Sequence, residues 1–452
     1  PPGATFMNPP VALSTTALRT PEPPITDLMQ RALANPALIS LAAGFVDHAT
    51  LPVEATAEAA AALLADGTEA RRALQYGTTR GDLKLRTQLV RLLEQNEGVP
   101  EGTYAEVVHR TVVTTGSQQL IYLIAEALLD PGDIVLVEAP TYFVFLGILQ
   151  SRGVRAVGVE TDSGGLRLDS LEATFRKLEA EGDLGRVKLI YTVSEHSNPS
   201  GLSLAKERRR PLVELARRWS RQHRIFILED AAYRGLTFSG QDPPSVWSHD
   251  PEGDTVALAR TFSKTFSPGL KTGYGVLPEG LLTPVLHIKG NHDFGSAHFN
   301  QQLLEHLIAN GSYGRQMERL VVTYRRKRDV MLEALEQRLG SVGGVSWTRP
   351  QGGIYVWLTV PLEVQTGRSG KLFTRCLERG VLYVPGEYAF APEPGPVHTN
   401  CARLSFGVVS EAGLVEGIGR LAAALADCLD ERIEPVKTMA SAQRAPVMVP
   451  TR

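Results

Sequence analysis

The chain has 452 residues, with 47 basic and 49 acidic side chains and a net charge of −2. That balance argues against a protein that binds nucleic acid through bulk electrostatics, and the length suggests two or three domains. No apolar run approaches the roughly 18 residues that a membrane span needs. The three cysteines, at positions 376, 401 and 428, are too widely spaced for a disulfide framework or a zinc site, so we expect no metal. The first residues do not resemble a signal peptide, and we expect a cytoplasmic protein.

The chain divides into an arm, two domains and a tail. Residues 1–38 are expected to form an N-terminal arm, which is rich in Pro and Thr over 1–26 and therefore favours an extended chain. We assign 39–300 to a large domain and 301–435 to a helical connection followed by a small C-terminal domain. The N-terminal segment could contribute part of that small domain, and 436–452 form a tail.

Continuous apolar strands alternate with helices in the middle of the chain. This order is typical of a mostly parallel sheet that is covered by helices on both faces. The predicted strands are 110–116, 134–138, 155–160, 187–193, 224–230, 255–260 and 272–276, and the helices between them are 117–130, 168–182 and 205–223. Helical periodicity then dominates to residue 339, and strands and helices of a smaller α+β domain follow.

Polar residues stand where several of these strands end. Gly116 and Ser117 open a helix whose free N–H groups favour an anion. Asn198, Asp230 and Lys264 follow three later strands. Each of them alone has a plain explanation, as a helix cap, a turn residue, a helix-starting aspartate or a surface lysine. Taken together they fall at the carboxyl ends of strands, where sites form in such sheets.

Six motifs occur in a fixed order along the chain: TTGSQQ, VEAPTY, NPSG, LEDAAY, SKTFSPGLKTG and ARLSF. With them the chain resembles the class I/II aminotransferases, which are fold-type I enzymes dependent on pyridoxal 5′-phosphate. The resemblance extends from about Ile39 to Leu429. It implies an α/β, PLP-dependent transferase fold, with a large, mostly parallel sheet of the seven-stranded type and a smaller α+β domain.

The resemblance also implies roles around the cofactor ring. Lys264 would hold the cofactor aldehyde as a Schiff base and then transfer protons. Asp230 would pair with the pyridine nitrogen, and Asn198 and Tyr233 would hydrogen-bond the phenolic oxygen of the ring. Tyr142 would stack on the ring face, although a core tyrosine at a strand end would give the same sequence pattern.

The cofactor phosphate would be held by Ser117, Gln118, Ser263 and Lys271, with Thr261 as a helper. The family usually carries arginine where Lys271 stands. Lysine keeps the charge but lacks the forked geometry of a guanidinium, so cofactor binding should persist with some loosening.

Three further residues are implied on the substrate side and at a subunit contact. Arg403 would pair with the substrate α-carboxylate alongside Asn198, unless it is a surface arginine at a strand end. The backbone of Gly44 would pass close to the substrate. Tyr76 resembles a tyrosine that reaches across a dimer to the phosphate of the neighbouring subunit, so we expect a homodimer with shared active sites. The alternative is a tyrosine packed on its own subunit.

The sequence departs from the family pattern at two further places. Glu195 and His196 precede Asn198 where relatives more often carry an aromatic or Asn-rich stretch. They are either part of a solvated loop or polar contacts at the mouth of the active site. Near Gly44, Val46 stands where the family more often has proline, and His48 follows Asp47. With these changes, the resemblance does not indicate the substrate class.

The leading functional prediction is an aminotransferase that moves the amino group of an α-amino acid to a keto acid in two half-reactions, a ping-pong scheme. The alternative keeps the cofactor but makes or breaks C–C or C–X bonds, by γ-elimination, substitution or condensation, as in specialised metabolism. A transcription regulator built on the same fold is disfavoured by the near-neutral charge. We therefore expect small-molecule substrates, and neither nucleic acid nor a membrane as partner.

Overall fold

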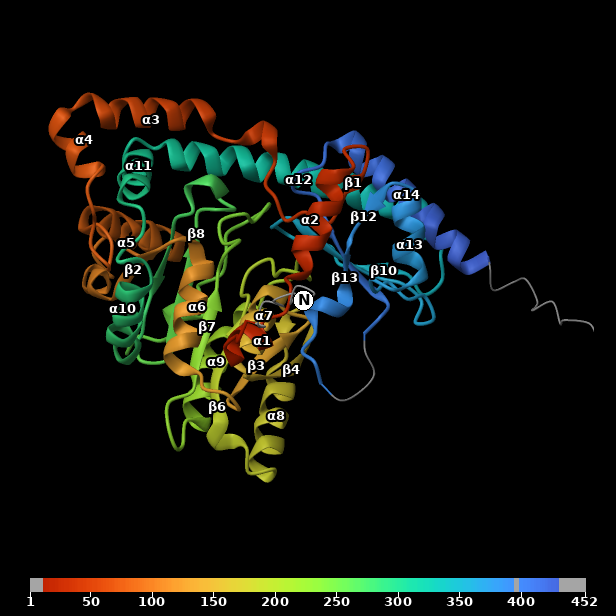
Figure 1. Ribbon diagram of the computed structural model, residues 1–452, viewed down its shortest axis with the longest axis horizontal. Helices are drawn as coiled ribbons and strands as arrows, with labels where there is room; N and C mark the ends of the chain where they lie inside the picture. Colours follow the sequence, from red (N-terminus) through yellow and green to blue (C-terminus); the bar gives the residue numbers. More distant parts are fainter. Residues whose placement is uncertain (1–10, 394–397, 431–452) are drawn as a thin grey trace, which may run out of the picture.

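The computed structural model describes residues 11–393 and 398–430. The large domain is built on an eight-stranded sheet (Figure 1). Its strands lie in the order β2 (Thr111–Thr114), β9 (Gly273–Val276), β8 (Val256–Thr261), β7 (Phe226–Asp230), β6 (Val187–Thr192), β3 (Ile134–Ala139), β4 (Arg155–Asp162) and β5 (Gly165–Leu166). The pairs from β8 through β4 are parallel, and β2, β9 and β5 pair in the antiparallel sense. The mostly parallel sheet is confirmed, and its seven predicted strands are joined by β5, a two-residue edge strand.

Both faces of this sheet are buried, which explains the continuous apolar strands. In β3, Ile134 and Leu136 pack in one hydrophobic cluster, whereas Val135 and Val137 pack in another on the opposite face. Helices α5 (Leu83–Glu97), α8 (Leu168–Ala180) and α9 (Lys206–Trp219) cover the first face, and α6 (Gly116–Leu128), α7 (Phe143–Arg152) and α10 (Glu279–Asp293) cover the second.

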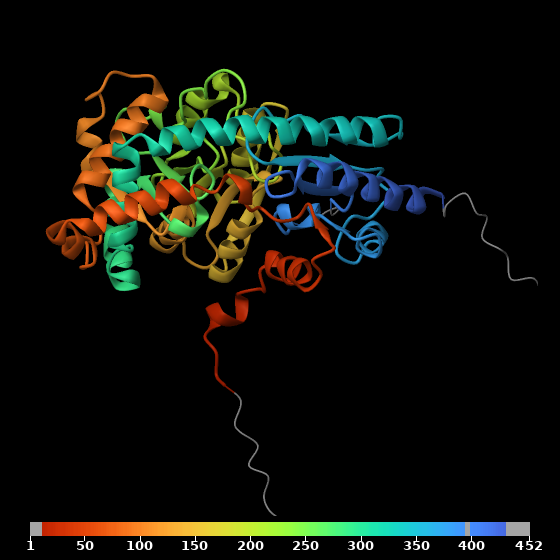
Figure 2. The same ribbon diagram turned by 90° about the horizontal axis from the view of Figure 1, so that it is seen from above.

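A long helix connects the large domain to the small one. Helix α12 (Ser312–Leu339) has 28 residues and runs from the region of α3 (Val53–Ala65), α4 (Gly67–Ala73) and α11 (His298–Ala309) to the small domain (Figures 1 and 2). There an antiparallel sheet has the order β10 (Ser346–Trp347), β11 (Tyr355–Thr359), β14 (Cys401–Ser405) and β13 (Val384–Pro385). Helices α13 (Lys371–Glu378) and α14 (Glu411–Asp430) pack with it. The predicted boundary at residue 300 stays a prediction.

The N-terminal segment contains two helices within the described residues, so the expectation of an extended chain over 1–26 is wrong at Thr15–Arg19 and from Pro24 onward. Helices α1 (Thr15–Arg19) and α2 (Pro24–Ala34) lie along one side of the molecule (Figure 2). A proline is well suited to the first turn of a helix, where its missing N–H is not needed. Residues 1–10 and the predicted tail, 436–452, lie outside the described residues.

The N-terminal segment also joins the small domain. Strand β1 (Ile39–Ser40) pairs in parallel with β12 (Val381–Leu382), and Leu28 of α2 is buried in the hydrophobic cluster of the small domain. This segment therefore connects the small domain to the large one at the cavity described below. Within the described residues, no helix is both long and apolar enough to cross a membrane.

Candidate active site

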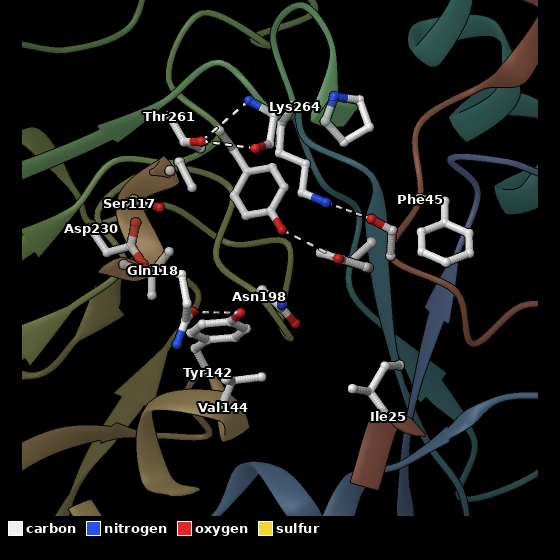
Figure 3. Close-up of a pocket in the computed structure, with 18 of the residues that line it drawn as sticks. Ile25, Phe45, Ser117, Gln118, Tyr142, Val144, Asn198, Asp230, Thr261 and Lys264 are labelled. Atoms are coloured by element: carbon white, nitrogen blue, oxygen red, sulfur yellow. Dashed lines mark hydrogen bonds between the residues drawn. The ribbon is translucent and has the colours of Figure 1, made fainter. Parts of the chain in front are cut away.

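A cavity of about 390 Å³ lies between the carboxyl ends of the parallel strands and the small domain (Figure 3). Sequence reasoning placed twelve residues at such a site besides Tyr76, and the structure brings all twelve to its wall. They are Gly44, Ser117, Gln118, Tyr142, Asn198, Asp230, Tyr233, Thr261, Ser263, Lys264, Lys271 and Arg403.

Asp230, at the end of β7, has one carboxylate oxygen with a partner and one without. The Tyr191 hydroxyl donates to Oδ2 at 2.9 Å, whereas Oδ1 is buried and has no hydrogen-bond partner. Burial raises the pKa of Asp230 to about 6, although the hydrogen bond from Tyr191 opposes this shift. An unpartnered buried carboxylate oxygen is costly unless a donor is supplied, and a protonated ring nitrogen is such a donor.

Lys264 follows β8 on the other side of the cavity, and its side chain is half-buried. Its Nζ donates to the Gly44 carbonyl at 2.5 Å (Figure 3). Burial lowers the pKa of Lys264, and the nearby cations Arg403 and Lys271 lower it further. A lysine amine in this environment loses its proton more easily than one in water, as a nucleophilic amine requires.

The start of α6 forms a cradle of backbone N–H groups. Gly116 begins the helix with φ of 71°, a left-handed conformation that favours glycine. Strand β9 passes so close that a Cβ on Gly273 would lie 2.7 Å from the backbone nitrogen of Ser117. Opposite, the Thr261 hydroxyl donates to Ser263 Oγ at 3.0 Å (Figure 3). Free N–H groups, hydroxyls and the nearby Lys271 suit a phosphate dianion.

Arg403 lies on β14 with its guanidinium buried in the cavity wall. Nη1 donates to Asn198 Oδ1 and Nη2 donates to the Ala42 carbonyl, each at 2.7 Å. The Nε group is buried and has no partner. Since Arg403 forms no ion pair in the described residues, its charge remains available for an anion in the cavity.

Two predicted cofactor residues are engaged with other side chains. The Tyr142 hydroxyl donates to Gln118 Oε1 at 3.2 Å, so the Gln118 amide is directed at Tyr142 (Figure 3). The Tyr233 hydroxyl donates to Tyr355 at 3.2 Å. Both contacts order the side chains that face the middle of the cavity.

Sequence reasoning missed four apolar residues of the cavity wall and one tyrosine. Ile25 and Met29 come from α2, and Phe45 and Val144 complete the apolar wall (Figure 3). Tyr355 enters from β11 in the small domain. The spacing of four residues between Ile25 and Met29 indicates one face of a helix. The local sequence does not indicate that this face covers a cavity.

Glu195 and His196 lie neither in a solvated loop nor at the cavity. The Glu195 carboxylate is fully buried and accepts hydrogen bonds at 2.7 Å from Arg209 and from Arg234. The ring of His196 is buried against the hydroxyl of Thr237, with Nε2 at 2.7 Å. Both predicted alternatives are therefore wrong. These residues connect the loop after β6 to Arg209, Arg234 and Thr237 in the protein interior.

Gly44 lines the cavity, but the residues from Val46 to His48 do not belong to its wall. Val46 is buried, and Asp47 forms an ion pair with Lys327 of α12 at 2.7 Å. His48 is exposed and does not line the cavity. Tyr76 is also outside the cavity, with 81% of its surface exposed and its ring edge-on to Phe294.

Pyridoxal phosphate fits these residues, since the cavity offers an unpartnered carboxylate, a half-buried amine and an anion cradle. A family model described as "Aminotransferase class I and II" matches residues 36–421. This chain belongs to that family. Aromatic-amino-acid aminotransferase 1 of Thermococcus litoralis is 34% identical over 385 residues, which cover 85% of this chain and 87% of that protein.

Solved structures agree with this assignment. A multiple substrate aminotransferase from Thermococcus profundus is 32% identical, with a TM-score of 0.83 over 93% of this chain and 98% of that one. Pyrococcus horikoshii kynurenine aminotransferase, solved in complex with PMP, is also 32% identical, with a TM-score of 0.83 over 92% of this chain and 97% of that one. The protein is a PLP-dependent aminotransferase of fold type I, and no comparison favours the alternative chemistry.

The buried Glu195 network gives a first prediction about stability. Glu195→Ala leaves the Arg209 and Arg234 guanidinium groups buried without their shared carboxylate, so we expect a loss of about 3–5 kcal/mol in unfolding free energy. Urea unfolding followed by circular dichroism measures it. Glu160→Ala is the matched control, because Glu160 pairs with Arg167 while 70% exposed and should cost less than about 1 kcal/mol. Equal losses in the two variants would contradict the prediction.

Proposed function

We propose that this aminotransferase acts on α-amino acids with neutral, apolar or aromatic side chains. The observation that carries the proposal is the distribution of charge in the cavity. Lys264, Lys271 and Arg403 are its cations, and no fourth one lines the described part of the wall. If these three serve the aldehyde, the phosphate and the α-carboxylate, none is left for a carboxylate on the substrate side chain.

When bound, pyridoxal phosphate supplies the aldehyde that accepts an amino group and a protonated ring that withdraws electrons. Asp230 would accept the hydrogen bond of the ring nitrogen through its free Oδ1 and so keep that nitrogen charged. Lys264 would hold the cofactor through its aldehyde and, once the substrate amine has replaced it, would carry the proton from the substrate Cα to the former aldehyde carbon. Asn198 and Tyr233 would bind the phenolic oxygen, and Tyr142 would cover the ring.

The remaining residues would hold the two ends of the reacting molecules. Ser117, Ser263 and Lys271, with help from Thr261, would bind the phosphate together with the backbone N–H groups of α6. Arg403 would bind the α-carboxylate of the substrate, with Asn198 holding its guanidinium in place. Gln118 would act mainly through Tyr142, to which it is hydrogen-bonded.

The apolar wall supports the choice of substrate side chain. Ile25, Met29, Phe45 and Val144 line the cavity, and none of them can pair with a charge. Burying apolar surface there contributes about 25 cal/mol per Å² to binding. The name of the Thermococcus litoralis relative, an aromatic-amino-acid aminotransferase, is consistent with this assignment.

We also propose a homodimer in the cytoplasm. Tyr76 and Phe294 form an aromatic pair that is 81% and 63% exposed, respectively, which a second copy of the chain would cover. There Tyr76 would reach the phosphate of the partner's site. The three cysteines, all buried, suit a reducing compartment.

Reduction with borohydride tests the cofactor link. Treating the holoprotein with borohydride should fix the cofactor to Lys264, which peptide mass spectrometry would locate. Lys264→Ala should retain the fold, escape this labelling and lose about 10²–10⁴-fold in the rate of amino transfer. Lys289→Ala is the control, because Lys289 is a buried lysine that pairs with Asp293 outside the cavity wall. A labelled site other than Lys264 would overturn the role proposed for it.

A charge placed in the apolar wall tests the substrate class. Met29→Arg should raise kcat/KM for an acidic amino acid such as glutamate by about tenfold, because a hydrogen bond to a charged group is worth about 1.5–3 kcal/mol. It should lower kcat/KM for phenylalanine. Met29→Leu, which keeps the wall apolar, serves as the control. A wild-type enzyme that prefers glutamate to phenylalanine would contradict the proposal.

Hybrid dimers test the shared site. Tyr76→Ala should weaken cofactor binding, and Lys264→Ala should lose most of the transfer rate, so neither homodimer is fully active. Mixed after mild dissociation, the two variants should recover activity, because each hybrid contains one site with both native residues. Light scattering gives the oligomeric state. A fully active monomer, or no recovery on mixing, would rule out a site completed by Tyr76 of the partner.

A further inference from the structure

Tyr355 brings a hydroxyl into the cavity that the roles proposed above do not use. It is the first residue of β11, pairs with Ser405 of β14 and is only 1% exposed. The Arg403 guanidinium carbon lies over its ring, 4.3 Å from the centroid. The Tyr233 hydroxyl donates to its oxygen at 3.2 Å, and a hydrogen bond received by this oxygen favours the deprotonated form of Tyr355.

Gly44 lies next to both this hydroxyl and the Lys264 amine. The Gly44 carbonyl accepts the hydrogen bond from Lys264 Nζ at 2.5 Å. A Cβ built on the same glycine would lie 2.5 Å from the Tyr355 hydroxyl oxygen. The amine and the hydroxyl therefore both lie next to Gly44, and a side chain at this position would displace Tyr355.

The charges around Tyr355 distinguish it from the other tyrosines of the cavity. Burial raises the pKa of Tyr142 and of Tyr233. Burial acts on Tyr355 as well, but Arg403, Lys264 and the hydrogen bond from Tyr233 outweigh it, so the pKa of Tyr355 is lowered. The titratable and charged groups facing it are Lys264 after β8, Arg403 on β14, Tyr233 after β7, Tyr142 before α7 and Tyr324 on α12.

We propose that Tyr355 is a catalytic residue that exchanges a proton with Lys264. The phenolate oxygen takes a proton from the Lys264 ammonium, so an O–H bond forms as an N–H bond breaks and no electrons are gained or lost. The amine is then uncharged, as it must be to attack an aldehyde or to take a proton from Cα. This inference rests on the proposed role of Lys264.

The test uses the cofactor-free protein, so that it does not depend on activity. Acetic anhydride acetylates only the uncharged amine, and mass spectrometry of the Lys264 peptide across a pH series gives the midpoint for that amine. The Tyr355 phenolate raises the pKa of Lys264. Tyr355→Phe should therefore shift the midpoint downward, by about one pH unit. Tyr383→Phe is the control, since Tyr383 is a buried small-domain tyrosine whose hydroxyl donates to the Thr366 carbonyl, and the midpoint should not move.

Ultraviolet absorbance of the tyrosine phenols gives a second readout, which begins with the wild-type protein. The wild-type protein should show one phenol ionising below the ordinary tyrosine pKa of about 10, and Tyr355→Phe should lack it. In the loaded enzyme, Tyr355→Phe should lower kcat about tenfold or more with little change in KM and should shift the pH profile. An unchanged Lys264 midpoint, or no phenol ionising below the ordinary range in the wild type, would overturn the inference. Borohydride labelling of Lys264 that still succeeds would show that the proposed cofactor role survives that outcome.

Discussion

Burial of charge at the carboxyl ends of parallel strands is the constraint on which this structure depends. Asp230 ends β7 and Lys264 follows the neighbouring strand β8, and the buried carboxylate and the half-buried amine form no ion pair with each other. The Asp230 carboxylate keeps one oxygen without a partner, and the Lys264 amine has only a carbonyl. Such groups are costly in a folded protein unless a ligand completes them, which makes the cavity complementary to a cationic ring nitrogen and an aldehyde.

Rigid surroundings hold these groups in place. Both carboxylate oxygens of Glu229 accept backbone N–H groups, from Val246 and Trp247, directly beside Asp230. The Glu195 network connects the loop after β6 to α9 and to the turn that carries Tyr233. Glu195, which the sequence analysis considered as a contact at the mouth of the active site, thus stabilises the loops that carry the residues of the cavity wall.

The small domain and the N-terminal segment supply the cavity wall that lies across from the strand ends of the large domain. Arg403 and Tyr355 come from adjacent strands of its sheet, and the N-terminal segment carries Ile25, Met29 and Gly44 to the same cavity. Substrate recognition and the proton chemistry of Lys264 therefore meet where the two domains face each other. A change in the packing of the small domain would alter both.

The sequence by itself determined the sheet and the cofactor side of the site. Strands buried on both faces must be apolar throughout, so β3, β6, β7 and β8 could be recognised, and their carboxyl ends located Asp230 and Lys264. Only the tertiary structure decided that α2 covers the cavity, that Glu195 binds two arginines and that Tyr355 and Lys264 both lie next to Gly44. These contacts join segments far apart in the chain, and the local pattern of a helix or strand shows which side is buried but not which distant group it is buried against.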